Sequence, residues 1–432
     1  MKSFGRFFLI VLLLGLSACF VYAGVALAVP AEKPLTLVDC YHLALKQSEI
    51  IGQDAELVKE AEAHFVQALG AILPHVSFES TIERQDKGHG AGGPSVVPVG
   101  NSSQRNFIFK QLLFSGFREF AGMAGAHLER SQRENEKARA EQLLFVDVAD
   151  AFYLFLEEQE DLNTLFSIKQ ALLDRIGQLN ERERVGRSRR SEVVNTETQL
   201  YSVEADIELS RGQVDVARQL LEFLVGRPVI EVADVGESFP SFLKPETEYT
   251  SRADTRRDVK ATKDAWEVAK KGVVIARADF FPTISAETDY FTHLTTQPTD
   301  QKWDAFLTID VPIFQGTETI GAVKAAQTQA RFAELEFRRT KRLALTDIRD
   351  SYVSLNYDIL RVKALNKALK AAEMNYLLQN EDYKLSVVNN LDVLAAIQSL
   401  QNTRRDYIHS FYETKRFYWQ LLIAAGEEIQ TI

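Results

Sequence analysis

Two halves of the sequence repeat each other in order. Pro74 has a counterpart in Pro282, 208 residues later, and beyond the following loop the spacing becomes 200 residues and is kept. At that spacing the matched residues include Phe114 with Phe314, Gly116 with Gly316, Leu200 with Leu400, and Gly226 with Gly426. The period is far too long for the unit of a solenoid. We therefore expect one structural unit built twice, over residues 35–226 and 251–428, with residues 227–250 as the linker.

Each copy contains two short runs in which apolar and polar residues alternate. The runs cover 76–83 and 104–114 in the first copy, and 284–291 and 303–313 in the second. Alternation with a period of two predicts β-strands. A helical segment precedes each pair of strands, over 36–72 and 251–280, and ends just before the matched proline.

A very long helix follows the strands in each copy. Proline is absent from 117–176 and from 317–385, and about 60 residues at ~1.5 Å each would reach about 90 Å. Apolar residues recur there every three or four positions, which is the pattern of a coiled coil. Return helices are predicted over 191–225 and 391–425, each followed by a glycine where a C-cap belongs.

The junction between strand and long helix repeats as Phe-x-Gly. Gly116 and Gly316 would supply the permissive backbone of a turn. Phe114 and Phe314 would lie at a membrane interface, where aromatic side chains collect. Pro312 suits the end of a strand because it has no N–H to donate.

The N-terminus has the pattern of a secretory signal peptide over residues 1–28. Cleavage after Ala28 follows the Ala26-Leu27-Ala28 motif, whereas Leu16-Ser17-Ala18-Cys19 resembles a lipobox that would lipidate Cys19. We favour cleavage after Ala28, because the apolar run continues past Cys19. No later segment has the 18 or so apolar residues of a membrane helix.

Four strands per chain cannot close a barrel. Each strand is about ten residues long, which is the length of a tilted membrane strand, and open sheet edges are not tolerated in lipid. Three chains with four strands each would form a closed 12-stranded barrel. The predicted fold is therefore an α+β membrane protein, in which a trimeric β-barrel is joined to long coiled-coil helices.

Several other classes of function are excluded. The seven histidines lie in no metal-ligand spacing, no Gly-rich phosphate loop follows a strand, and there is no G-x-S-x-G motif. We expect no enzyme, no metal site and no cofactor. A net charge of −10 argues against a nucleic-acid partner.

Together these features resemble the TolC-like outer-membrane efflux proteins. The resemblance lies in the duplication, the Leu-Pro and Phe-Pro pairs before strands, "VPIFQG" at the start of a long helix, and the hairpin "YKLSVVNNLDVLAAIQSLQNTRRDY". It implies a homotrimer in outer-membrane lipid, whose 12-stranded β-barrel is continued by a long periplasmic α-helical coiled-coil barrel. Such a trimer forms the exit duct of a tripartite efflux pump or type I secretion system. Its partners would be a periplasmic adaptor (membrane fusion) protein and an inner-membrane transporter of ABC, RND or MFS type, which would choose the cargo. The alternatives are an exported coiled-coil scaffold without a pore and a duct for metal ions.

The resemblance also implies functional residues at the hairpin tips. Asp392 matches the first acidic position of the family's periplasmic aperture, whereas the second acidic position is Ala395 and the nearby basic position is Val388. Glu192 is the candidate aperture residue of the first copy. The residues that resemble the adaptor-docking grooves are Arg184, Val185, Gly186, Lys384, Leu385 and Ser386. The same residues could also be plain turn residues. The basic tip over 184–190 would either meet an acidic adaptor or be solvated.

Overall fold

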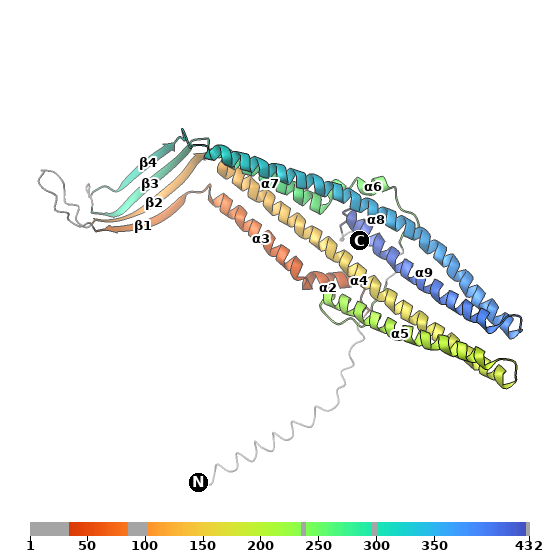
Figure 1. Ribbon diagram of the computed structural model, residues 1–432. Coiled ribbons are helices and arrows are strands. Elements are labelled where there is room, and N and C mark those ends of the chain that lie inside the picture. The colour runs from red at the N-terminus through yellow and green to blue at the C-terminus, as the bar shows by residue number, and fades with distance from the viewer. Residues whose placement is uncertain (1–33, 85–101, 235–238, 296–299, 429–432) are drawn as a thin grey trace, which may run out of the picture.

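The computed structural model describes residues 34–84, 102–234, 239–295 and 300–428. The predicted signal peptide, with Cys19 and both cleavage motifs, lies outside the described residues. Figure 1 shows an elongated molecule with a small sheet at one end and two helical hairpins at the other. Most of its residues are helical.

In the described part of the chain, four strands form one antiparallel sheet in the order β1-β2-β3-β4. Their bounds are β1 His75–Glu83, β2 Ser102–Ser115, β3 Thr283–Leu294 and β4 Trp303–Asp310. The prediction of two strands per copy is thus confirmed, and β1 and β4 are the two edges of the sheet. The predicted extension of the last strand to residue 313 is wrong, because β4 ends at Asp310 and Pro312 lies beyond it.

Helices α4 (Arg118–Arg184) and α8 (Glu318–Lys384) run the length of the helical part of the molecule, with 67 residues each. At ~1.5 Å per residue each is about 100 Å long. They return as α5 (Arg190–Val225) and α9 (Asn390–Ala424), which pack against them as two hairpins. The expected apolar seams are buried, at Phe145, Val148, Phe152, Phe155, Leu165, Ile348, Leu355 and Ile359.

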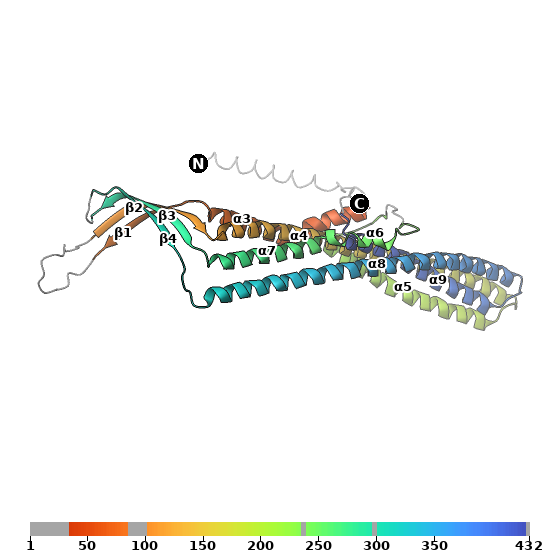
Figure 2. The ribbon, with the colours of Figure 1, turned by 90° about the horizontal axis from the view of Figure 1, so that it is seen from above.

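Nearer the sheet, shorter helices pack beside α4 and α8. Figure 2 shows α3, α4, α7 and α8 side by side in this order, and each neighbouring pair is in contact. The single helix expected over 36–72 is two helices, α2 (Leu37–Gln47) and α3 (Glu49–Gly70). Ser48 separates them because its backbone is extended and its hydroxyl accepts the amide of Ile51 at 3.3 Å, which caps α3.

The helix expected over 251–280 is also interrupted. Its range holds the 3-10 turn η1 (Ala253–Thr255) and α7 (Arg257–Ala278), and a short helix, α6 (Glu246–Thr250), lies just before it in the predicted linker. Arg256 has an extended backbone between η1 and α7, and its buried guanidinium donates to Asp258 and Asp347. The pair with Asp258 is local, whereas the pair with Asp347 ties this break to α8.

The glycine junctions have the backbone that the sequence predicts. Gly116 and Gly316 have φ of 67° and 65°, in the left-handed region that favours glycine. At Gly116 a Cβ would lie 2.7 Å from the carbonyl oxygen of Ala278, so that no other residue fits without movement. None of the helices in the described ranges contains an apolar stretch that could cross a lipid bilayer.

Candidate functional site

The tips of the two hairpins have the same turn geometry. The amides of Gly186 and Arg187 donate to carbonyls near the end of α4 at 2.9 and 2.8 Å, and the amides of Ser386 and Val387 do the same at the end of α8, at 3.0 and 2.9 Å. This pair of bonds is the Schellman motif, which needs a left-handed residue after the helix. Gly186 adopts that conformation with φ 72°, and Ser386 with φ 60°. Both tips are therefore defined turns.

The two return helices begin differently. The side chain of Asn389 accepts the amides of Leu391 and Asp392 at 2.7 and 3.2 Å, and the Asp392 carboxylate accepts the Asn389 amide at 3.0 Å. This reciprocal pair is a capping box. At the start of α5 the N-cap residue is Arg189, whose side chain makes no capping bond. Asp392 is exposed, but its carboxylate also holds the first turn of α9.

Glu192 lies between the two hairpins. Its carboxylate accepts the Ser188 hydroxyl at 2.7 Å and lies 3.5 Å from the hydroxyl of Tyr383 on α8. The side chain is half-buried. Glu192 therefore connects the start of α5 to the end of α8 across the hairpin boundary.

A buried arginine completes this connection. Arg175 on α4 is 2% exposed, donates from Nε to Asn390 Oδ1 at 2.8 Å, and lies 3.4 Å from the ring centroid of Tyr383. Asn390 in turn donates to Thr196 Oγ1 at 3.1 Å. Burial lowers the pKa of the Arg175 guanidinium, and the nearby Tyr383 and Glu192 offset part of that shift. We call these residues, Arg175, Glu192, Thr196, Tyr383 and Asn390, the tip clasp.

The tip clasp was not predicted from the sequence, although a signal is present. Arg175 occupies a seam position of α4, between Leu172 and Leu179, where the neighbouring seam residues are apolar and fully buried. A charged residue in a coiled-coil seam usually specifies one arrangement of partners. The tip clasp joins all four helices of the two hairpins close to the turns at their tips.

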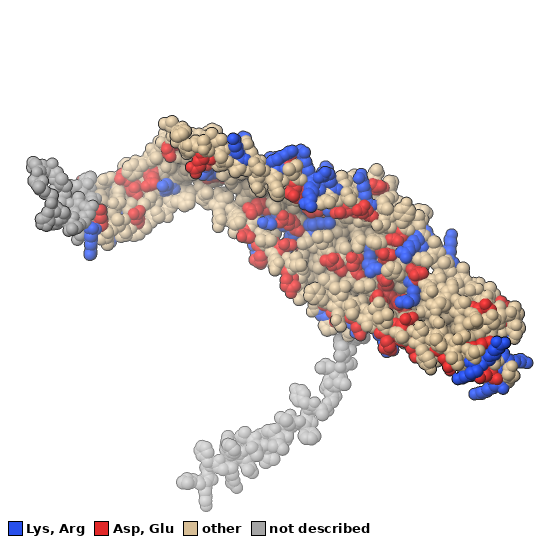
Figure 3. All heavy atoms as spheres, in the orientation of Figure 1, with Lys and Arg blue, Asp and Glu red and all other residues tan. Residues whose placement is uncertain are grey.

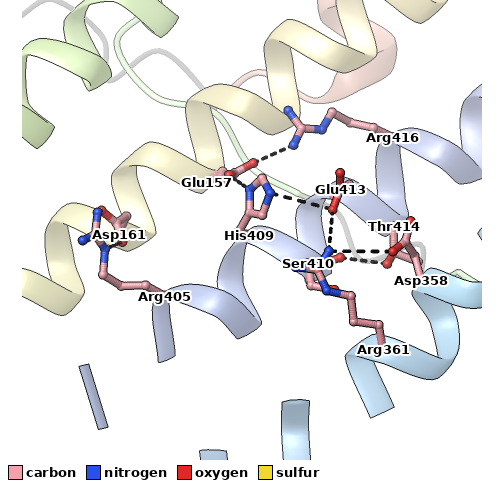
Figure 4. Close-up of polar contacts among 10 residues, drawn as sticks. All are labelled: Glu157, Asp161, Asp358, Arg361, Arg405, His409, Ser410, Glu413, Thr414 and Arg416. Carbon is pink, nitrogen blue, oxygen red and sulfur yellow. Dashed lines mark hydrogen bonds and ion pairs between the residues drawn. The ribbon is translucent and has the colours of Figure 1, made fainter. Parts of the chain in front are cut away.

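A second group of ion pairs joins α4 to α9 further from the hairpin tips (Figure 4). Glu157 is buried and accepts from His409 Nδ1 at 2.6 Å and from Arg416 Nη2 at 2.9 Å. One turn further, Arg405 donates two bonds to Asp161 at 2.6 and 2.9 Å. The burial of the two carboxylates is thus compensated by two arginines and by the hydrogen bond to His409.

All six predicted docking residues are exposed at the tips. Val185 and Leu385 are 68% and 75% exposed, which is high for aliphatic side chains. Figure 3 shows Lys and Arg gathered at the end of the shaft that carries these turns. The structure brings the predicted docking residues, Glu192 and Asp392 together at one end of the molecule, and the Phe-x-Gly junctions lie at the other end of α4 and α8.

The described residues contain no group of three or more His, Cys, Asp or Glu side chains that could hold a metal ion. Cys40 is fully buried, and burial raises the pKa of its thiol to about 12. A thiol with such a pKa is a poor nucleophile.

Comparison with known proteins identifies the family. The family model described as outer membrane efflux protein matches residues 40–227 and 251–427. The chain is 25% identical over 418 residues to the alkaline protease secretion protein AprF of Pseudomonas aeruginosa, covering 91% of this chain and 84% of AprF. It is 22% identical over 290 residues to the outer membrane protein TolC of Escherichia coli, covering 63% of this chain and 59% of TolC.

Solved outer-membrane channels share the fold. VceC of Vibrio cholerae superposes with a TM-score of 0.79 at 20% identity, covering 90% of this chain and 96% of VceC. CmeC of Campylobacter jejuni gives a TM-score of 0.75 at 16% identity, covering 90% of this chain and 85% of CmeC. The chain therefore belongs to the outer membrane efflux protein family, as a TolC-like protein of the outer membrane that extends into the periplasm.

Proposed function

We propose that the protein is the exit duct of a tripartite efflux pump or type I secretion system, without catalytic activity. The observation that carries this proposal is a membrane-length sheet with two open edges, joined to hairpins about 100 Å long, in a chain of the outer membrane efflux protein family. AprF, whose name describes protease secretion, favours the secretion system as the context.

The two faces of the sheet differ in polarity. Phe78 pairs with Phe107, Phe107 with Tyr290, and Tyr290 with Trp303, so that one aromatic row crosses all four strands on one face. The opposite face carries polar pairs, such as Asn106 Nδ2 donating to Asp289 Oδ1 at 2.7 Å and Lys110 beside Glu287. Apolar-out and polar-in alternation with an aromatic girdle is the pattern of outer-membrane barrels.

The other boundary of the apolar band coincides with the strand-to-helix junctions. Phe114 lies seven residues after Phe107 on β2, which is about 23 Å along the strand. That length is of the same order as the ~25 Å apolar band of outer-membrane barrels. Phe314 is 86% exposed beside Gly316 and Pro312, which supports a place for it in the membrane interface.

Among the described residues of one chain, the edge strands β1 and β4 have no further partner in the sheet. Because unpaired backbone is costly in lipid, we propose that β4 of one chain pairs with β1 of the next, and that three chains close a 12-stranded barrel. Exposed apolar residues also follow both outer edges of the helical part, at Tyr201, Leu209, Val216 and Phe223 of α5 and at Val353, Tyr357, Leu360 and Leu377 of α8. Contacts between α5 and α8 of neighbouring chains would bury them.

We place the periplasmic aperture and the adaptor contacts at the tips. Asp392 would contribute one carboxylate per chain to the aperture, with Glu192 as the alternative. The docking residues would be the exposed turn residues of both hairpins, Arg184, Val185, Gly186, Lys384, Leu385 and Ser386. Residues 35–226 and 251–428 would be two copies of one unit.

The decisive experiment is native mass measurement of the full chain in detergent, together with conductance in planar bilayers. A trimer with stepwise conductance supports the duct, whereas a stable monomer, or a protein that stays soluble without detergent and does not conduct, would support the pore-free scaffold. Val216→Glu should weaken the trimer by placing a charge in the proposed α5–α8 contact, and Val216→Ala, which adds no charge, should weaken it far less. The intact mass also gives the N-terminus, Val29 for ordinary cleavage or a lipidated Cys19.

A further inference from the structure

A row of polar side chains crosses three strands beside the aromatic row of the sheet. Arg105 on β2 lies opposite Ser80 on β1 and opposite His293 on β3, and all three side chains are exposed. Phe107 of the aromatic row lies two residues after Arg105, which is about 7 Å along the strand. Because residues two apart share a face of a strand, the two rows lie on the same face. We call Ser80, Arg105 and His293 the rim row.

A β-bulge places His293 in the rim row. Asn106 pairs with Phe291, whereas the preceding residue of β2, Arg105, pairs with His293, so that the register passes over Thr292. Without this extra residue, Thr292 would stand opposite Arg105. The Thr292 hydroxyl instead donates to the Arg105 carbonyl at 3.0 Å and so supports the bulge. Bulges at the rims of barrels commonly re-aim a side chain in this way.

The rim row stands on a face without carboxylates. By alternation from the paired positions, the acidic residues of the four strands all lie on the opposite face, at Glu79, Glu83, Glu287, Asp289, Asp304 and Asp310. Lys110 is also there, 3.3 Å from Glu287. By contrast, the guanidinium of Arg105 makes no hydrogen bond or ion pair with any residue that the structure describes.

The depth of Arg105 in the proposed duct is that of lipid headgroups. Arg105 is the fourth residue of β2, at the end of the sheet away from α4 and α8 (Figure 1). Since those helices extend into the periplasm, this end faces the outside of the cell. Arg105 stands just beyond the aromatic girdle, where a charge on the lipid face costs far less than at the middle of the bilayer. A phosphate at this depth would pair with it.

We propose that the rim row binds the phosphate of a phosphorylated glycolipid headgroup in the outer leaflet. Arg105 would donate two bonds to phosphate oxygens, and the Ser80 hydroxyl and the His293 imidazole would each donate one. A free phosphate ion would gain only these polar contacts, whereas a lipid also contacts the aromatic row. The proposal rests on the proposed function, because closure of the trimer puts this face in lipid, and it adds a specific bound lipid.

The test is native mass spectrometry of the full chain in detergent with three probes. The first probe is lipid A with both phosphates, the second is the same lipid after removal of both phosphates, and the third is inorganic phosphate as a competitor. We expect the phosphorylated lipid to bind at least about tenfold more tightly than the dephosphorylated lipid, which corresponds to about one charge-assisted hydrogen bond. The preference should fall as salt rises, because the row is exposed.

Three variants locate the effect. Arg105→Gln removes the charge and should abolish the preference, and Arg105→Lys, which keeps the charge but loses the planar fork, should retain part of it. Lys110→Gln is the matched control, because it removes a cation from the opposite face of the same strand and should leave the preference unchanged.

Three outcomes would overturn the proposal: equal binding of the two lipids, an unchanged preference in Arg105→Gln, or displacement of the lipid by inorganic phosphate at equal concentration. Planar-bilayer conductance of the parent chain distinguishes this failure from that of the proposed function. A chain that conducts but shows no preference for the phosphorylated lipid refutes this inference alone, whereas a monomer that does not conduct refutes the duct.

Discussion

Asp392 has two roles that substitutions can separate. Its carboxylate accepts the amide of Asn389 and so caps α9, and we place the same charge in the periplasmic aperture. Asp392→Asn keeps an oxygen that can accept the bond but removes the charge, whereas Asp392→Ala removes both. Asp392→Ala should therefore also destabilise the first turn of α9, because the capping box involves this side chain.

The magnitudes of the two effects can be estimated. Loss of a capping interaction typically costs about 1 kcal/mol, which corresponds to about fivefold faster exchange of the Asn389 amide by local opening. For the charge, a divalent cation ~10 Å from each of three carboxylates gains roughly 2.5 kcal/mol in water, and screening at 0.1 M salt lowers this to about 1 kcal/mol. Neutralisation should thus weaken divalent-cation block by about fivefold.

Two assays measure the capping effect and the charge effect of Asp392 separately. Hydrogen exchange should show faster exchange at the first turn of α9 in Asp392→Ala and a smaller change in Asp392→Asn. Planar-bilayer conductance should show weaker block in both variants. Ala395→Asp, one turn along α9 on an exposed position, should strengthen the block because it adds a second carboxylate per chain.

The outcome that would refute this reasoning is equally specific. If Asp392→Asn leaves cation block unchanged while Glu192→Gln abolishes it, then the aperture is formed by the first hairpin and Asp392 is a capping residue alone.

Three further results are expected from the shaft and the turns. Ser386→Gly should slow hydrogen exchange at its turn by stabilising it by about 0.5–1 kcal/mol, since φ is positive there, and Gly186→Ser should do the reverse at the matched turn. Arg256→Met should lower the free energy of unfolding at pH 7 by about 3–5 kcal/mol, because it leaves the carboxylate of Asp258 without its partner. Burial alone raises the pKa of Asp258, but its bonds to Arg256 bring that pKa below the ordinary value. This stability is therefore present above about pH 4 and is lost as pH falls through the lowered pKa, so the thermal unfolding of variant and parent should converge as the pH falls below it. The thiol of Cys40, with a pKa of about 12, should resist alkylation at pH 8 in the native protein, and rapid alkylation would contradict its burial.

Local patterns of the sequence predict much of the fold. Alternation over 303–313 predicted β4, the Phe-x-Gly junction predicted a left-handed turn at Gly316, and the glycine at 226 predicted the end of α5. These features depend on neighbours within a few residues, so that periodicity and backbone preference are sufficient to find them.

The tip clasp and the break before α7 depend on contacts between distant segments. Arg175 binds Asn390, which is 215 residues away in the chain, and Arg256 at the start of α7 binds Asp347, which is 91 residues away. A local pattern cannot show which segments meet, because the approach of α4 to α9 is set by the packing of whole helices. The sequence by itself determined the strands and the helical hairpins, whereas the tertiary structure decided which charged side chains lie buried between the helices and join the two hairpins at the tips.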